Sequence, residues 1–133
     1  MWSKPVYALY DFCNEGADNL MLKWARKESL STRDRATLDV KMDSLAINGL
    51  DLIPKLVSPV EKQPGIFKLR IQTKRALRPM FCRGPFTVGE EFTFLLGTIE
   101  ENFKLDPPAS QATTNKNVLL ADRKRRVPHE RFH

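Results

Sequence analysis

The sequence predicts an α+β domain: a small antiparallel sheet, two N-terminal helices packed on one face of it, and a C-terminal helix or tail. The hydrophobic patterns follow one another as one strand, two helices and then three strands. The length of 133 residues lies in the ~100–150-residue range of a common single domain. Hydrophobic residues make up 41% of the chain, which suits a buried core. We expect one domain over residues 1–122 and a basic tail over residues 123–133.

The N-terminal part predicts a strand followed by a helix. Residues 6–12 are rich in aromatic and apolar side chains, as in a strand. Residues 18–29 have helical spacing, with Asp18 placed to cap the helix. The expected buried stripe of this helix is Leu20, Met21, Trp24 and Ala25.

A second helix is expected over residues 32–48. Ser31 and Asp34 have the spacing of a capping box, and Gly49 is placed to end the helix in the left-handed conformation. Residues 50–65 contain three prolines and predict a connection with an extended piece. The expected core positions of the helix are Leu38, Met42 and Leu45.

Three strand patterns and a helix follow. Residues 66–74 alternate apolar and polar side chains, as a half-buried strand does. Residues 77–83 predict a second strand that Pro79 confines to an edge or a bulge. Residues 91–99 predict a third strand with Phe92, Phe94 and Leu96 on one face, residues 108–121 a helix, and the basic end a mobile tail.

The positive charge is concentrated in the strand region. The net charge is +6, yet residues 62–89 hold seven Lys and Arg and no acidic residue. The alternation in residues 66–74 places two to three of these cations in a row on one solvent-facing surface, about 6–7 Å apart. This block predicts a polyanion site.

Cysteine and histidine usage excludes several classes of site. Cys13 and Cys82 are too few for a disulfide framework or a four-cysteine zinc site, and read as small buried apolar residues. His129 and His133 lie in the last five residues, which argues against histidine-based catalysis in the core. No apolar run approaches a membrane span and no signal-peptide pattern is present. We expect a soluble, reduced, cytoplasmic protein without a metal, a cofactor or a membrane contact.

Short motifs in the strand region resemble the HigB-like, phage-derived branch of the RelE/ParE toxin superfamily. The matching positions are Leu69-Arg70, Arg78 with Met80-Phe81, the run Phe94-Leu95-Leu96-Gly97, and Pro107. The resemblance covers roughly residues 5–120, and the order of elements carries as much of it as any single motif.

The resemblance implies the toxin of a type II toxin–antitoxin pair. Such toxins are typically endoribonucleases that cleave mRNA on the ribosome without a metal. Their implied partners are mRNA, the ribosome and a cognate antitoxin, often of the helix-turn-helix type. The implied fold is RelE-like.

Cleavage without a metal requires a base for the 2′-OH, an acid for the leaving 5′-oxygen, and cations on the phosphate. We expect Arg70 and Arg78 to hold the phosphate, because a guanidinium binds it through two donors. Lys68 or Lys74 is the expected proton-handling group. The expected RNA-binding residues are Arg75, Arg83, Phe103, Arg123, Lys124, Arg125 and Arg126.

Several alternatives stay open at this point. Phe103 is either a stacking platform for a base or a core residue, and the tail cations either contact nucleic acid or are solvated. Glu100 and Glu101 stand where relatives carry cations, so they repel RNA unless one of them serves as a base. The alternative function is a non-catalytic binding module on the same fold, such as a phage-encoded or gyrase-directed inhibitor.

Overall fold

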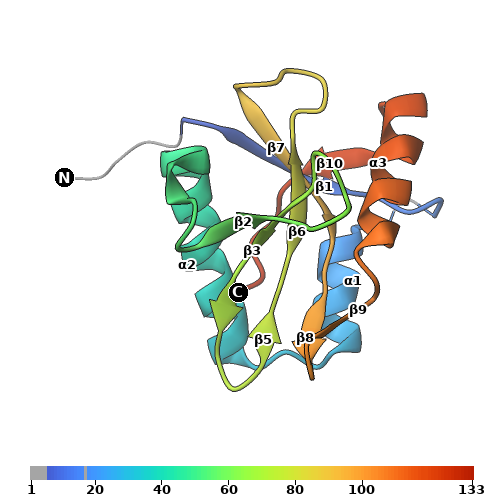
Figure 1. Cartoon of the computed structure of the whole chain (residues 1–133). Coiled ribbons are helices and arrows are strands. Elements are labelled where there is room, and N and C mark those ends of the chain that lie inside the picture. The colour runs from blue at the N-terminus through green and yellow to red at the C-terminus, as the bar shows by residue number, and fades with distance from the viewer. Residues whose placement is uncertain (1–5, 17) are drawn as a thin grey trace.

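The computed structural model describes residues 6–16 and 18–133. In this part of the chain, the larger of two sheets has six strands in the order β10-β1-β7-β6-β3-β2 (Figure 1). β1 runs parallel to β7, and the other neighbours are antiparallel. The strands are β1 (Ala8–Phe12), β2 (Val57–Pro59), β3 (Phe67–Leu69), β6 (Met80–Arg83), β7 (Glu91–Leu96) and β10 (Arg126–Pro128).

The smaller sheet continues the larger one. Its antiparallel order is β4-β5-β8-β9, formed by β4 (Ile71–Gln72), β5 (Ala76–Leu77), β8 (Ile99–Glu101) and β9 (Lys104–Asp106). Backbone hydrogen bonds cross the breaks between the sheets, from Leu69 N to Pro79 O (2.9 Å) and from Arg78 N to Thr98 O (2.8 Å). The three strand patterns of the sequence are therefore long strands, each interrupted at one point.

Helices cover both faces of the strands. α1 (Leu20–Lys27) and α2 (Thr32–Asn48) pack on one face, and α3 (Ser110–Ala121) packs on the other. Figure 1 shows α2 and α3 on opposite sides of the strands. A short 3-10 turn, η1 (Gly49–Leu52), follows α2. The mixed α+β class is confirmed.

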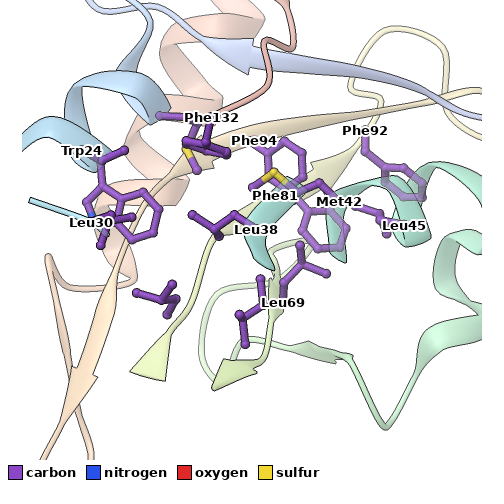
Figure 2. Close-up of a cluster of buried hydrophobic side chains, with 14 of the residues drawn as sticks. Trp24, Leu30, Leu38, Met42, Leu45, Leu69, Phe81, Phe92, Phe94 and Phe132 are labelled. Atoms are coloured by element: carbon purple, nitrogen blue, oxygen red, sulfur yellow. The ribbon is translucent and has the colours of Figure 1, made fainter. Parts of the chain in front are cut away.

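Aromatic and aliphatic side chains fill the space between the strands and the first two helices. Figure 2 shows Phe81, Phe92 and Phe94 of β6 and β7 beside Leu38, Met42 and Leu45 of α2. The core positions expected in α2 are all buried. Met80, Cys82 and Leu95 point to the other face, where α3 contributes Ala112 and Leu119.

The helix boundaries follow local hydrogen-bonding signals. Asn19, not Asp18, caps α1, since its Oδ1 accepts from Met21 N at 3.0 Å and Leu22 N at 3.1 Å. The Ser31–Asp34 capping box is confirmed in both directions. Gly49 ends α2 at φ 57° and ψ −142°, outside the left-handed helical region that the sequence predicts.

A β-bulge in β7 changes which side chains face the core. Met80 pairs with Leu96 while the next residue, Phe81, pairs with Phe94, so Leu95 is the extra residue. The prediction that Leu96 shares a face with Phe92 and Phe94 is therefore wrong, because Leu96 packs in the cluster with α3. Beyond the bulge the alternation is reversed.

Pro79 acts at a break rather than at an edge. β6 lies between β3 and β7, so the prediction of an edge strand is wrong. Pro79 falls in the gap between β5 and β6, where a missing backbone N–H removes no ladder bond. The register irregularity beside it, between Met80 and Phe81, agrees with the alternative of a bulge.

The C-terminal residues are held by the fold, and the prediction of a mobile tail is wrong. β10 pairs with the edge of β1. Phe132 is buried in the α1–α2 core, where Figure 2 shows it near Phe94. The buried carboxylate of Asp39 accepts hydrogen bonds from Phe132 N (2.8 Å) and His133 N (3.0 Å). Asp11, fully buried, lies 2.8 Å from His129 Nδ1.

Across residues 6–16 and 18–133, no helix is both long enough and apolar enough to cross a membrane.

Candidate functional site

Three charged side chains converge on the face of the strands that is opposite α1 and α2. Glu100 Oε1 lies 3.5 Å from Arg78 Nε and 4.0 Å from Lys68 Nζ. The side chains of Lys68, Arg78 and Glu100 are 22%, 13% and 29% exposed, so the cluster is shielded but reachable by solvent. We call these three residues the charged triad. It combines one carboxylate with two cations.

The strand alternation explains why the triad gathers there. Leu69, Leu77 and Ile99 are the chain neighbours of the triad residues, and all three are buried in the α1–α2 core. Successive side chains of a strand point to opposite faces. The triad residues therefore point away from that core, toward the face that α3 covers in part.

Arg78 is held rigidly at the break between β5 and β6. Its Nη1 donates to Ile71 O at 3.0 Å and to Leu77 O at 3.1 Å. The buried hydroxyl of Thr98 donates to Arg78 O at 2.8 Å, while Arg78 N donates to Thr98 O. The guanidinium thus fills backbone acceptors that the interrupted ladder leaves open, and its Nε remains directed at Glu100.

Arg70 is the open cation on this face. It lies between Leu69 and Ile71, which both face the α1–α2 core, so alternation places its side chain on the side of Lys68. The residue is exposed, and its guanidinium has no ion-pair partner within the described ranges. It can bind an anion without breaking a contact of the fold.

Three other cations of residues 62–89 do not join the triad, so the expectation of one shared cationic surface is wrong for Lys74, Arg75 and Arg83. Arg75 reaches α1 instead, donating from Nη1 to Glu28 O and from Nη2 to Glu28 Oε1, both at 2.6 Å. Lys74 is exposed and lines a surface hollow of about 610 Å³ beside Arg33. Arg83 lies at the far end of β6 and lines a different hollow.

Phe103 occupies a strained and fully exposed position. It forms the two-residue turn between β8 and β9 with Asn102, at φ values of 63° and 52°. Both values lie in the left-handed region, where an aromatic residue is a rare outlier. Its side chain is 100% exposed. The interpretation of Phe103 as core is wrong, and the turn presents the ring to solvent.

The tail cations make contacts within the fold. Arg126 pairs with buried Glu91 at 2.6 Å, and its guanidinium lies 3.7 Å from the centre of the Tyr10 ring. Arg125 Nε donates to Cys13 O at 2.9 Å, and Arg123 lies over the Phe86 ring at 4.3 Å. Lys124 is exposed. The solvated-tail alternative is therefore wrong for Arg125 and Arg126, which stabilise the C-terminal segment.

The two thiols are free and buried. Burial, the largest effect, raises the pKa of Cys82 to about 11. Burial also raises the pKa of Cys13, and the nearby Asp11 carboxylate acts in the same direction. Both stay protonated at neutral pH, in agreement with the reading of small buried apolar residues.

Glu100 is the residue of this site that sequence reasoning left unassigned. Continuing the alternation of Phe92 and Phe94 to even-numbered positions places Glu100 in the core, where a carboxylate is excluded. That conflict is the one signal in the sequence for the bulge at Leu95. Among the described residues, no group of three His, Cys, Asp or Glu side chains could hold a metal ion.

The chain was compared with protein-family models, with curated protein sequences and with solved structures, and none of them matches it.

Proposed function

We propose that this chain is the toxin of a type II toxin–antitoxin pair, with a RelE-like arrangement of a HigB-like branch, and that it cleaves mRNA on the ribosome without a metal. The observation that carries the proposal is the charged triad, because one carboxylate between two cations provides the groups that cleavage by the 2′-OH requires. The motif positions Leu69-Arg70 and Arg78 with Met80-Phe81 support the same family, because Arg70 and Arg78 both lie on the face of the charged triad.

Each residue has a defined part in the proposed reaction. Glu100 takes the proton of the substrate 2′-OH, and the 2′-oxygen attacks the adjacent phosphorus. Arg78 and Arg70 hold the phosphate oxygens and stabilise the added negative charge. The bond from phosphorus to the 5′-oxygen then breaks, and the Lys68 ammonium gives that oxygen a proton. The products are a 2′,3′-cyclic phosphate and a 5′-hydroxyl, so atoms and charges balance.

Phe103 supplies a contact for a base in this proposal. An exposed aromatic ring on β-turn backbone stacks with any base, and such contacts are worth about 1–3 kcal/mol each. β8 joins the two functions, since Glu100 lies in this strand and Phe103 follows it in the turn. The partners in this proposal are mRNA, the ribosome and a cognate helix-turn-helix antitoxin, all in the cytoplasm.

End-group chemistry tests this function. Bacterial ribosomes programmed with a 5′-labelled mRNA are incubated with the protein, and the fragments are mapped and analysed for their termini. We expect discrete cuts with 2′,3′-cyclic phosphate ends, and no cut where the attacking nucleotide is replaced by its 2′-deoxy form. Uncut mRNA, or cuts that survive the 2′-deoxy replacement, would refute it.

A second candidate, the non-catalytic inhibitor, is favoured by one observation. The Arg78 guanidinium is already engaged with two carbonyls and with Glu100, which suits a structural cation as well as a catalytic one. Expression in a bacterial cell separates the two functions. Loss of translation with intact DNA supercoiling supports the nuclease, and loss of supercoiling with continued translation supports the inhibitor.

A further inference from the structure

A small apolar hollow opens beside α1, and none of the charged-triad residues lines it. Its apolar walls are Leu20 and Trp24 of α1, Leu96 at the end of β7, Gly97 directly after it, and Pro107. Its volume is about 160 Å³. Small-molecule sites in proteins span about 300–1,000 Å³, so this hollow is too small for a cofactor. It has the size for one large apolar side chain.

The absence of a side chain at Gly97 allows the Trp24 ring to pack directly against the backbone there. A Cβ built at Gly97 would lie 2.0 Å from the Trp24 ring, so no other residue fits against it. Trp24 is only 6% exposed, since it is packed into the core. The hollow is therefore a fixed part of the fold, with a buried ring and a bare backbone among its walls.

The rim of the hollow is positively charged. Lys23 and Lys27 line it, and Arg26 is a third exposed cation on the same helix. α1 contains no acidic residue between Leu20 and Lys27. Glu28, which also lines the hollow, is bound to Arg75 at 2.6 Å, so its charge is already balanced. The apolar hollow thus lies within a cationic rim.

We infer that this α1 surface binds an acidic segment of a partner protein, which inserts one Leu or Phe side chain into the hollow. An apolar anchor in a pocket, surrounded by complementary charge, is the usual arrangement of a binding hot spot. RNA fits less well, because the buried Trp24 ring offers no open face for a base. The surface does not include the charged triad, so the inference stands independently of the proposed nuclease function.

A synthetic peptide tests the inference without knowledge of the natural partner. The probe is an acidic amphipathic helix with a single Phe anchor, and matched probes carry Ala or Leu there. Trp2→Phe leaves Trp24 as the only tryptophan, so its fluorescence reports binding at the hollow. We expect the Phe and Leu probes to bind about tenfold more tightly than the Ala probe.

Charge reversal provides the second arm of this experiment. The Lys23→Glu/Lys27→Glu double variant changes exposed residues only, and we expect it to weaken the Phe probe about tenfold or more. The matched control, Lys55→Glu, reverses an exposed cation outside the hollow and leaves binding unchanged. Absence of binding, affinity without anchor dependence, or equal Trp24 quenching by a uridine decamer would each overturn the inference.

Discussion

At the scale of single residues, the Glu91–Arg126 pair shows how the fold tolerates buried charge. Glu91 is 6% exposed, and Arg126 contacts both of its carboxylate oxygens, at 2.6 and 3.2 Å. Burial opposes the ionised carboxylate most strongly. Hydrogen bonds from Arg126 and from backbone amides outweigh burial and hold the pKa of Glu91 below its ordinary value. This contact joins the C-terminal segment to β7.

The pair predicts a specific acid sensitivity. Because the folded-state pKa of Glu91 is lower than the ~4.3 of an unperturbed glutamate, its stabilisation is complete above that pH. The stabilisation is lost as the pH falls through the folded-state value. Glu91→Gln leaves Arg126 without its charge partner, and we expect a cost of about 3–5 kcal/mol at neutral pH. Urea unfolding measured at several pH values checks both effects.

Glu90→Gln is the control for this measurement, because Glu90 is exposed beside the pair. It should leave the free energy of unfolding almost unchanged. The interpretation fails if the stability of Glu91→Gln declines in acid as steeply as that of the wild type.

At the scale of elements, the bulge at Leu95 determines which side chains of β8 face the α1–α2 core and which face the charged triad. Strict alternation from Phe92 and Phe94 predicts that Glu100 points into the α1–α2 core. The single extra residue reverses the faces, which buries Ile99 and directs Glu100 toward Lys68 and Arg78. The charged triad is therefore a product of one irregularity in one strand.

The same elements show how far the sequence could predict the fold. Local patterns place α1, α2 and α3, and the Ser31–Asp34 capping box marks the start of α2, because these signals depend on neighbours within a few residues. The pairing of β1 with β7 and the burial of Phe132 depend on contacts between distant segments, which no local pattern encodes. Likewise, residues 62–89 contain no acidic residue, yet several of their cations form ion pairs in the fold. Glu28 pairs with Arg75 and Glu100 pairs with Arg78, and no local pattern predicts these pairs.

In the turn between β8 and β9, we expect one substitution to raise the free energy of unfolding and to lower the affinity for RNA. Phe103 in the left-handed region costs about 1–2 kcal/mol, while glycine adds about 0.5–1 kcal/mol of chain entropy to the unfolded state. Phe103→Gly should therefore stabilise the protein by up to about 1.5 kcal/mol. It should also weaken RNA binding by about 1–3 kcal/mol, because the stacking ring is gone. Thermal unfolding and fluorescence anisotropy measure the two changes.

Asn102→Gly is the matched variant for this turn, since it relaxes the neighbouring residue and keeps the ring. We expect it to bind RNA like the wild type. RNA affinity that is unaltered in Phe103→Gly would contradict the role of the ring.

At the scale of the whole molecule, the C-terminal segment completes both the larger sheet and the core. β10 covers the edge of β1, and Phe132 completes a core built from α1, α2 and the strands. Asp11 and Asp39, both buried, accept hydrogen bonds from this segment. The last residues therefore belong to the domain rather than to a tail.

Truncation of the anchoring side chain should unfold the protein at a much lower denaturant concentration. Phe132→Ala removes a buried ring, and we expect a loss of about 3–5 kcal/mol in the free energy of unfolding. His133→Ala, at an exposed neighbour, serves as the control. If both variants retain wild-type stability in urea, the C-terminal segment is not part of the cooperative fold.

The charged triad carries the functional account, and the rate of mRNA cleavage by Glu100→Gln tests it most directly. Single-turnover cleavage on programmed ribosomes is compared among the wild type, Glu100→Gln and Glu101→Gln, each verified by thermal unfolding. The account predicts that Glu100→Gln slows cleavage about 10²–10⁴-fold, as loss of a general base does, whereas Glu101→Gln stays near the wild-type rate. Equal rates for the wild type and Glu100→Gln would contradict the account.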